Sequence, residues 1–526
     1  MDIRHQAERR RTFAIISHPD AGKTTLTEKL LLYARAIHLA GSVKSRKASR
    51  HAVSDWMQME KERGISVTTS VLQFEHRGKA LNLLDTPGHA DFSEDTFRTL
   101  AAVDTAVMLM DHAKGVEPRT QKLFEVCRLR KLPVVTFMNK LDRHGLDPLE
   151  LLDQVSRTLD LKMAPVNWPI GKGDEFRGVV DVASREVSLF DAHGHGDQIV
   201  VAHRMPLTAA EAALGSSLFD SVWEDLELLE GAGEKYSHDA FLAGELSPVF
   251  WGSAMDNFGV EALLDYIVDH AAPPAPRSTQ EGQVIAPTDD RFSGFIFKIQ
   301  ANMNPRHRDR IAFMRVVSGH FERGMDVVIG RTGETLRMAK PHSFLAQERS
   351  LVEEAWPGDI VGVYDSGKLR VGESLAAGTP TKFAGIPHFA PEYFGKMTLA
   401  DPMRRKSLDS GLEQLAQEGV IQVLLRPGDT LANAILGAVG LLQFDVLAER
   451  LANEYNVRAR FETLPYNHAR WINGPQSAID WLKNRSDCVF VTDSHGNPVV
   501  LAATEWTFKF ALDKNKGLEL HTVEPL

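Results

Sequence analysis

The stretch Phe13-Ala-Ile-Ile-Ser-His-Pro-Asp-Ala-Gly-Lys-Thr-Thr-Leu-Thr27 decides the fold of the N-terminal part of this chain. Its apolar beginning predicts a buried strand, and a short polar loop then leads into an amphipathic helix that opens at Gly22-Lys23-Thr24. This order suits triphosphate binding, because loop N–H groups and a helix N-terminus both face the anion. We expect Lys23 to reach the β- and γ-oxygens and the Thr24 hydroxyl to occupy a Mg²⁺ position.

One position departs from the phosphate-loop pattern G-x-x-x-x-G-K-[ST], because Ser17 stands where the first glycine belongs. An ordinary strand-to-helix turn with a capping residue is the alternative interpretation. Gly22 favours phosphate binding, since a residue without Cβ lets the backbone approach the ligand closely. The stretches that follow along the chain decide between the two.

Composition places the chain among multidomain globular proteins. Its 526 residues are too many for one core and suggest about three domains. The net charge of −10 argues against general nucleic-acid affinity, and we expect no DNA partner. Cys127 and Cys488 are the only cysteines and offer neither a disulfide framework nor a zinc spacing. The absence of a secretory signal and of a long apolar run predicts a cytoplasmic protein without a membrane partner.

A long polar segment, from Lys44 to Thr69, precedes a strand-like run, Val67 to Phe74. One interpretation is a solvated surface loop. The other is a segment that becomes ordered over the γ-phosphate and Mg²⁺ and loosens after hydrolysis. In that case Ser66 or Thr68 supplies a hydroxyl ligand; the position of Ser66 after Arg63-Gly-Ile is preferred, and Thr68 stays open.

The next candidate loop is Leu81-Asn-Leu-Leu-Asp-Thr-Pro-Gly-His89. A buried strand ends in Asp85, which can reach Mg²⁺ through water, and the Gly88 N–H can contact the γ-phosphate. His89 follows directly, where its side chain can hold the attacking water in line. The alternative for His89 is a surface or capping histidine, and for D-x-x-G a simple turn.

A third loop, Asn139-Lys-Leu-Asp142, predicts selectivity for guanine. The Asp142 carboxylate can accept bonds from N1–H and the 2-amino group, which adenine does not offer in that arrangement. Asn139 is expected to address the other edge of the base and brace the phosphate loop, while the Lys140 stem covers the base face. In a fourth loop, Ser253-Ala254, the Ala254 N–H can bond guanine O6.

These four loops follow strands in order, as in a doubly wound α/β fold, where ligands bind at the carboxyl edge of a mostly parallel sheet. We therefore predict a P-loop GTPase domain that binds GTP or GDP with Mg²⁺. The predicted catalytic residue is His89, and the predicted metal ligands are Thr24, Ser66 and Asp85. The predicted nucleotide contacts are Ser17, His18, Pro19, Asp20, Ala21, Gly22, Lys23, Thr24, Thr25, Asp85, Thr86, Pro87, Gly88, His89, Asn139, Lys140, Leu141, Asp142, Ser253 and Ala254.

With these motifs in hand, the chain resembles the translational GTPases and, among them, the class II release factors of bacteria. The resemblance rests on the loops above and on Asp91-Phe-Ser-Glu-Asp-Thr96, Phe137-Met-Asn-Lys-Leu-Asp-Arg143, Phe295-Ile-Phe-Lys-Ile-Gln-Ala-Asn-Met303, His307-Arg-Asp-Arg310, Ala312-Phe-Met-Arg-Val-Val-Ser318 and Gly437-Ala-Val-Gly-Leu-Leu-Gln-Phe-Asp-Val446. It runs from about Arg11 onward and fades beyond Arg485.

The resemblance implies a ribosome-stimulated GTPase of translation termination. Such a protein binds the ribosome after peptide release and promotes dissociation of the stop-codon-reading release factor. It implies further that His89 positions the water, that Pro19 and Ile65 flank its access, and that Asp20 lies beside the phosphates. Ser66 stands where relatives carry threonine. Off the ribosome the chain is expected to be a monomer.

The predicted domain division follows a proline-rich stretch, Ala271 to Pro276. We expect a GTP-binding domain at 1–275 with a β-rich insertion near 167–203, a stiff linker at 276–290, a β-barrel at 291–380 and an α/β domain at 381–526. In the last domain, two helices should pack on an antiparallel sheet. Basic clusters at 306–310 and 404–406 are candidate RNA contacts or solvated turns.

Three alternative functions stay open at this point. A shortened relative of elongation factor G would share the same loops, although that family has further domains. A nucleotide-controlled scaffold would bind GTP without useful hydrolysis. An ATP-dependent kinase would tolerate ATP, which the carboxylate of Asp142 argues against.

Overall fold

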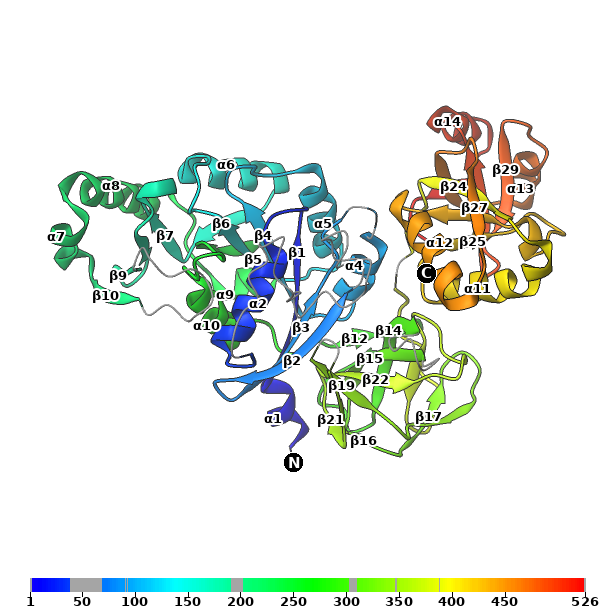
Figure 1. Cartoon of the computed structure of the whole chain (residues 1–526), viewed down its shortest axis with the longest axis horizontal. Helices are drawn as coiled ribbons and strands as arrows, with labels where there is room; N and C mark the ends of the chain where they lie inside the picture. Colours follow the sequence, from blue (N-terminus) through cyan, green and yellow to red (C-terminus); the bar gives the residue numbers. More distant parts are fainter. Residues whose placement is uncertain are drawn as a thin grey trace.

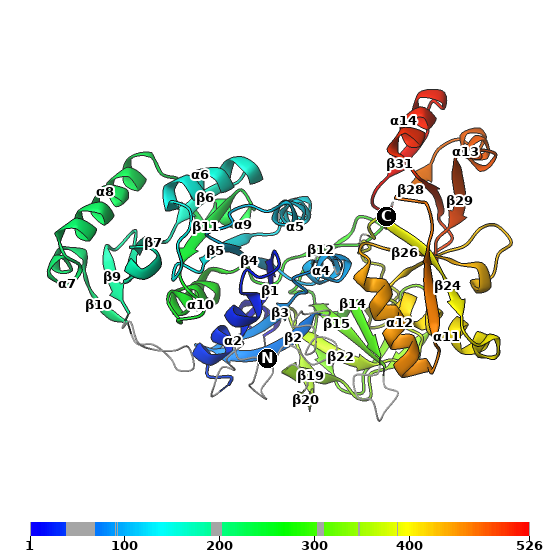
Figure 2. The ribbon, with the colours of Figure 1, turned by 45° about the horizontal axis from the view of Figure 1, so that its top comes forward.

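The computed structural model describes residues 2–37, 69–89, 91, 93–190, 202–301, 310–345, 348–386 and 388–524. Three bodies follow one another along the chain in Figure 1: a large α/β body, a β-rich body and a C-terminal body that mixes helices and strands. In the rotated view of Figure 2 the β-rich body lies against the strands β2 (Ser70–His76) and β3 (Lys79–Asp85) of the α/β body, with which it pairs through β19 (His342–Leu345). No helix in these residues has the length and apolar character needed to cross a bilayer.

The N-terminal body is built on one twisted sheet with β1 near its centre. β1 pairs in parallel with β3 on one side and β4 on the other; β2 pairs antiparallel with β3 and, at Leu72, meets β19 of the β-rich body. The prediction of a mostly parallel, doubly wound sheet is confirmed. The strand order is β2 (Ser70–His76), β3 (Lys79–Asp85), β1 (Arg10–Ser17), β4 (Thr105–Asp111), β5 (Val134–Asn139), β11 (Leu246–Trp251) and β6 (Lys162–Pro165).

Alternate residues of β1 enter two different apolar clusters, because successive side chains of a strand point to opposite faces. Phe13 and Ile15 pack in the cluster that contains α2 (Lys23–Tyr33) and α10 (Val260–His270). Ala14 and Ile16 pack in the cluster that contains α4, α5 and α6. Helices thus cover both faces, which explains why β1 is buried throughout its length and apolar from Phe13 to Ile16. The bounds are α1 (Ile3–Glu8), α4 (Ser93–Leu100), α5 (Pro118–Leu129) and α6 (Pro148–Leu159).

A small antiparallel sheet extends this body beyond β6 and precedes the Ser253-Ala254 loop. Its order is β10 (His203–Pro206), β9 (Glu186–Leu189), β8 (Gly178–Asp181) and β7 (Asn167–Ile170). These strands fall in the region near 167–203 where the sequence predicts a β-rich insertion, and the bounds of that insertion stay a prediction. The sequence analysis did not foresee the helices that follow it, α7 (Glu211–Leu214), α8 (Ser216–Ala232) and α9 (His238–Leu242).

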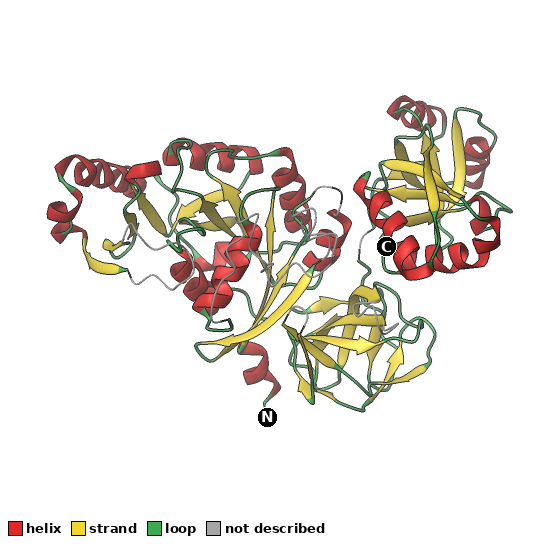
Figure 3. Ribbon diagram, viewed as in Figure 1, coloured by secondary structure: helices red, strands yellow, loops and turns green. Residues whose placement is uncertain are grey.

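The segment 276–290, predicted as a stiff linker, contains a short hairpin, β12 (Arg277–Ser278) with β13 (Val284–Ile285). The next body is β-rich (Figure 3), as predicted, with a closed apolar interior that includes Ile296, Met314 and Val361. Its strands are β14 (Ser293–Ala301), β15 (Arg310–Ser318), β16 (Phe321–Glu322), β17 (Asp326–Ile329), β18 (Thr335–Arg337), β19 (His342–Leu345), β20 (Glu348–Leu351), β21 (Glu354–Ala355), β22 (Ile360–Tyr364) and β23 (Ser374–Ala376).

The C-terminal body holds two antiparallel sheets, where the sequence predicted one. The expected part is α11 (Arg405–Gln417) and α12 (Leu442–Tyr455) on a sheet ordered β25 (Gln422–Leu424), β26 (Ile435–Ala438), β24 (Tyr393–Leu399) and β27 (Ala459–Thr463). The added sheet is β29 (Cys488–Thr492), β30 (Pro498–Ala502), β28 (His468–Asn473) and β31 (Glu519–His521), covered by α13 (Gln476–Lys483) and α14 (Glu505–Lys514).

The two sheets pack against each other through a shared apolar cluster. Phe394 and Ile435 from the first sheet lie in it together with Trp471 and Leu501 from the second. The second sheet contains a local hairpin, β29 with β30, but it is completed by pairings between distant residues, for example β28 with β31, which no local pattern encodes.

Candidate functional site

The phosphate loop lies between the end of β1 at Ser17 and the start of α2 at Lys23. Two residues of the loop, Asp20 and Gly22, have left-handed backbone conformations with φ of 65° and 98°. These turns direct the chain sharply from strand to helix. Ser17, which replaces the expected first glycine, is small and buried, so its side chain stays inside the sheet edge.

His18 is a buried member of the same loop. Neither of its ring nitrogens has a hydrogen-bond partner among the described residues. Burial lowers the pKa of His18, so the ring is neutral at pH 7. Its place in the loop leaves the backbone N–H groups, and not a histidine charge, as the anion-binding element.

The loop after β3 meets the phosphate loop at the sheet edge. Lys23 Nζ lies 2.5 Å from Asp85 Oδ1, and both side chains are buried. Thr86 donates from Oγ1 to the Ile15 carbonyl at 2.7 Å. A Cβ atom added to Gly88 would lie 3.9 Å from Lys23 Cε. The residues predicted for the β- and γ-phosphate end of the site thus meet at one point.

The same end of the site carries donors that suit Mg²⁺. Asp85 Oδ2 is buried and has no hydrogen-bond partner in the described part of the chain. The half-buried Thr24 stands one residue after Lys23. Carboxylate and hydroxyl oxygens are the ligand type that Mg²⁺ takes beside phosphates, so these residues fit the ion. The third predicted ligand, Ser66, lies outside the described residues, as do its alternative Thr68 and the flanking Ile65.

Asn139 links the base end of the site to the phosphate loop. Its Nδ2 donates to the Ala21 carbonyl at 2.7 Å, and its Oδ1 accepts from the Ala254 N–H at 2.8 Å. The first bond supplies the brace expected from the sequence. The second bond uses the Ala254 N–H, which was expected to bond guanine O6. Binding of guanine O6 by this N–H therefore requires that it release Asn139 Oδ1.

The predicted base-reading carboxylate lies beside the fourth loop. Asp142 Oδ1 accepts from Ser253 Oγ at 2.7 Å, and Asp256 Oδ2 accepts from the same hydroxyl at 3.1 Å. Leu141 is buried beneath this loop and its N–H donates to the Gly252 carbonyl at 3.3 Å. The carboxylate is therefore oriented by the loop that follows β11.

Asp111 is a residue of this site that the sequence analysis left without a role. Lys140 Nζ lies 2.8 Å from Asp111 Oδ2 and also donates to the Asp20 carbonyl. Burial favours a higher pKa for Asp111, but the hydrogen bonds from Lys140 and the Ala113 N–H outweigh it and lower the pKa. The ionised Asp111 thus holds the Lys140 stem across the base end of the loop. Its position at the end of β4, in line with Asp85 and Asn139, was the available signal.

His89 lies on the loop between β3 and α4, with about a third of its side chain exposed at 35%. Its Nδ1 accepts from the Asp91 N–H at 3.3 Å. The other end of Asp91 reaches the C-terminal body, where Oδ2 accepts from the Leu442 N–H at 2.7 Å. A Cβ atom on Gly440 would lie 2.1 Å from Asp91 Cγ, so the fit between the two bodies is tight here.

The helix α4, which continues this loop, is hydrogen-bonded to the C-terminal body and is linked to the barrel through Thr69 and an ion pair of Asp95 with Lys298 at 3.6 Å. Asp95 Oδ2 accepts from Thr69, whose carbonyl in turn accepts from Lys298 Nζ of the barrel at 2.7 Å. Arg98 donates from Nη1 to the Gly419 carbonyl at 3.3 Å in the C-terminal body. Arg98 also lies 2.5 Å from Glu94. The stretch 91–96 contributes to the family resemblance, but the sequence did not predict these contacts.

Glu94 is fully buried between Arg98 and His388. Burial by itself raises the pKa of Glu94, but the Arg98 charge and the His388 hydrogen bond lower it to about 2. The carboxylate is therefore ionised throughout the physiological range, and it links α4 to the segment that enters the C-terminal body.

Of the basic clusters considered for RNA contact, only part is described. Arg310 is committed to protein contacts, since it lies 2.8 Å from Asp365 and donates to Gln417 at 2.8 Å. Arg405 pairs with Asp409 at 2.9 Å. Residues 302–309 lie outside the described part of the chain, and RNA contact by these clusters stays a prediction.

Replacing Gly22 with alanine should weaken GDP and GTP binding strongly. The new Cβ would lie 2.5 Å from Asn139 Nδ2, at a backbone φ of +98°, so the brace must move as well as the loop. Gly78→Ala is the matched control, because Gly78 also has positive φ, +77°, but has nothing within 4 Å of the added atom. Each substitution should lower the free energy of unfolding by about 1–2 kcal/mol, because alanine is strained in the left-handed backbone conformation. Titration with a fluorescent GDP analogue should show a loss only for Gly22→Ala; equal affinities would contradict the proposed geometry.

Family models match three consecutive parts of the chain. The Elongation factor Tu GTP binding domain model matches residues 8–273. The Elongation factor G domain 2 model matches residues 291–378. The model named Class II release factor RF3, C-terminal domain, matches residues 383–512. The N-terminal body is therefore a guanine-nucleotide-binding GTPase domain.

Curated relatives match along nearly the whole chain. Peptide chain release factor 3 from Symbiobacterium thermophilum is 52% identical over 98% of this chain and 97% of its own length. The protein of the same name from Acaryochloris marina is 48% identical over 100% and 97%. A crystal structure of a Thermus thermophilus protein shares the fold, with a TM-score of 0.69, 23% identity, and coverage of 89% of this chain and 71% of that one. The chain belongs to the peptide chain release factor 3 family.

Proposed function

We propose that this chain is a ribosome-stimulated GTPase of translation termination. In this role it binds the ribosome after peptide release and promotes dissociation of the stop-codon-reading release factor. Family membership over the full length supports the assignment. The observation that carries it is the path from the phosphate end of the site, through Asp91 and α4, to both later bodies.

We propose nucleotide contacts that the geometry of the four loops supports. Lys23 and the loop N–H groups take the phosphates, Asp142 takes the guanine edge, and Asn139 holds the two ends of the site in register. Thr24, Asp85 and Ser66 would hold Mg²⁺, which supplies charge neutralisation at the β- and γ-oxygens when bound. The wider set of nucleotide contacts predicted from the sequence is proposed with them.

Hydrolysis in this site needs no covalent intermediate. Water attacks the γ-phosphorus in line, and the leaving group is the β-phosphate oxygen of GDP, whose developing charge Lys23 and the loop amides stabilise. His89 orients the attacking water. Because its ring now contacts Asp91, docking to a partner has to turn His89 toward the nucleotide. Turnover without that partner should be slow, roughly 10⁻⁴ to 10⁻² per second as in unassisted switch GTPases.

The contacts of Asp91 and α4 with the C-terminal body can couple the bound nucleotide to the arrangement of the bodies. A displacement of Gly88 at the γ-phosphate moves the loop that carries His89 and Asp91, and with it the N-terminal end of α4. Asp91, Glu94 and Arg98 would then change their contacts with the C-terminal body. We propose that this coupling lets the ribosome distinguish the GTP form from the GDP form.

Several further expectations belong to this proposal. The partners are the ribosome, the stop-codon-reading release factors and guanine nucleotides, with no membrane or DNA partner, and the chain works in the cytoplasm as a monomer off the ribosome. The division into 1–275, 276–290, 291–380 and 381–526, with the insertion near 167–203, stays a prediction.

The test is GTP hydrolysis measured with and without ribosomes. We expect stimulation by orders of magnitude, and little stimulation of ATP hydrolysis under the same conditions. A second assay follows the departure of a labelled stop-codon-reading factor from terminated ribosomes, with tRNA translocation as the contrasting readout. Equal hydrolysis rates with and without ribosomes would refute the proposal, as would translocation without factor release.

A further inference from the structure

Three chain segments meet at the border between the GTPase domain and the C-terminal body. His388 lies in the segment that enters the C-terminal body, and Glu524 follows β31 near the end of the chain. Backbone hydrogen bonds tie these two segments together: Glu524 N to His388 O and Ala390 N to Thr522 O, each at 2.8 Å. The third segment is the turn between β29 and β30, which carries His495.

The turn that carries His495 is internally fixed. Asp493 Oδ1 accepts from the N–H groups of His495 and Asn497, at 2.8 and 2.9 Å. Asn497 Nδ2 donates to Glu524 Oε1 at 2.6 Å. The turn and the C-terminal segment therefore hold His495 and Glu524 in a defined relation before any ligand binds.

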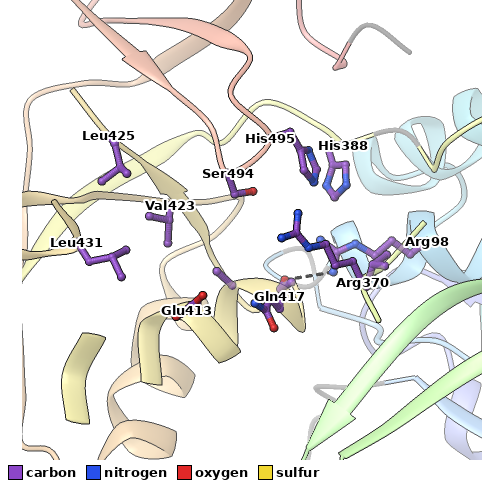
Figure 4. Close-up of a pocket in the computed structure, with 13 residues that line it drawn as sticks. Arg98, Arg370, His388, Glu413, Gln417, Val423, Leu425, Leu431, Ser494 and His495 are labelled. Carbon is purple, nitrogen blue, oxygen red and sulfur yellow. Dashed lines mark hydrogen bonds between the residues drawn. The ribbon is translucent and has the colours of Figure 1, made fainter. Parts of the chain in front are cut away.

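The side chains of His388, His495 and Glu524 converge at this point. His495 Nδ1 lies 3.0 Å from Glu524 Oε1, and His388 Nε2 lies 4.0 Å from Glu524 Oε2. The two imidazole rings are side by side in Figure 4, with their centroids 5.5 Å apart. One nitrogen of each histidine and one carboxylate oxygen lie within 4.8 Å of one another.

We propose that His388, His495 and Glu524 bind a divalent transition-metal ion of the zinc class. Two imidazoles and one carboxylate are a donor set that Zn²⁺ accepts, with bonds of about 2.0–2.1 Å. Ligands of such a tetrahedral ion are roughly 3.4 Å apart. Closing the present spacing takes small side-chain rotations, which the exposed His495 can make.

Glu94 supplies the support that a metal-binding histidine needs. His388 Nδ1 lies 3.2 Å from Glu94 Oε1, so the proton of the neutral ring belongs on Nδ1 and the lone pair on Nε2 points toward Glu524. A carboxylate that accepts from the second nitrogen of a metal-bound histidine fixes its tautomer and ring orientation. Glu94 belongs to α4, so the site connects the GTPase domain to the C-terminal segments.

The surroundings leave room for a fourth ligand. A cavity of about 270 Å³ adjoins the two histidines and is lined also by Arg370, Gln417 and Ser494. Water in this cavity can complete the tetrahedron. The neighbouring charges are mixed, because Glu94 pairs with Arg98 and the Arg370 guanidinium lines the same cavity.

A bound metal ion would link the three segments that carry His388, His495 and Glu524. Because His388 also bonds Glu94, the ion would stiffen the same border through which α4 contacts the C-terminal body. Its expected effect is on the coupling between bodies and not on the chemistry of GTP hydrolysis.

The test uses the full chain, stripped of metal with a chelator and then loaded with GDP and Mg²⁺ so that the nucleotide site is filled. Zn²⁺ is titrated in competition with a chromophoric chelator, and Co²⁺ is titrated as a spectroscopic probe. The variants are His495→Ala, whose side chain is exposed, and Glu524→Gln. The control is His468→Ala, which removes another histidine of the same body that pairs with a glutamate, Glu505 at 3.4 Å.

We expect one Zn²⁺ per wild-type chain, the same for His468→Ala, and an affinity at least about tenfold lower for each of the two site variants. Co²⁺ should give the intense visible absorption of a tetrahedral site in the wild type and His468→Ala, and not in the two site variants. Equal Zn²⁺ affinity in the wild type, His495→Ala and Glu524→Gln would overturn the proposal. So would the absence of Zn²⁺ binding by the wild type, which would leave the cluster as a set of imidazole–carboxylate pairs.

Discussion

Asp142→Asn should lower the affinity for GTP and GDP by about 10²–10⁴-fold. The amide retains one acceptor oxygen, so the bond from guanine N1–H persists but loses the negative charge of its acceptor. The new NH₂ group faces the 2-amino group of guanine, and two donors there repel each other. Hydrogen bonds to charged groups contribute about 1.5–3 kcal/mol each, and each 1.4 kcal/mol is about tenfold in affinity. Calorimetric titration with GDP measures the loss.

The same variant should gain affinity for xanthosine diphosphate, whose 2-oxo group accepts the bond that the new amide offers. This reversal separates loss of base recognition from loss of folding. Asp256→Asn is the matched control, since Asp256 shares the Ser253 hydroxyl with Asp142 but has no expected contact with the base. If Asp142→Asn kept its preference for guanine, or if both variants lost affinity equally, the assignment of Asp142 would be wrong.

His89→Ala should reduce ribosome-stimulated GTP hydrolysis by about 10²–10⁴-fold, the range typical of removing a positioned side chain that acts on a reacting water. GDP and GTP affinity should stay within a few-fold of the wild type, because the phosphates and the base are held by other groups, Lys23 and Asp142 among them. Single-turnover hydrolysis on ribosomes, with nucleotide affinity measured separately, gives both quantities.

His76→Ala serves as the control for this variant. His76 is also a partly exposed histidine of the GTPase domain beside a carboxylate, Asp265 at 3.6 Å, but it lies at the far end of β2 from the phosphate loop. Its hydrolysis rate should equal that of the wild type. A His89→Ala variant with normal stimulated turnover would show that another group orients the water.

Most of the candidate nucleotide site could be predicted from the sequence, because each of its loops is a short continuous segment. Each loop directly follows an apolar strand, and parallel strands bring all their carboxyl ends to one edge of the sheet. The sequence alone places Asp85, Asn139 and Asp142 at this edge in this way. Asp111 satisfies the same rule but carries no motif of its own, and its role became visible only when Lys140 lay beside it.

Contacts between bodies could not be read in the same way. Asp91 with Leu442, Arg98 with Gly419, and His388 with Glu94 join residues separated by hundreds of positions, and no periodicity or spacing encodes such pairs. The second sheet of the C-terminal body was missed for a related reason, since β28 pairs with β30 and β31, which lie far from it in the sequence.

The sequence by itself determined the GTPase domain, its mostly parallel sheet and the barrel, because strand periodicity, turn residues and motif order are properties of neighbouring residues. Only the tertiary structure decided where the three bodies touch, that α4 is held by both later bodies, and that two histidines and a glutamate from three segments converge beside it. Those arrangements depend on side-chain complementarity between surfaces that the chain brings together only when it is folded.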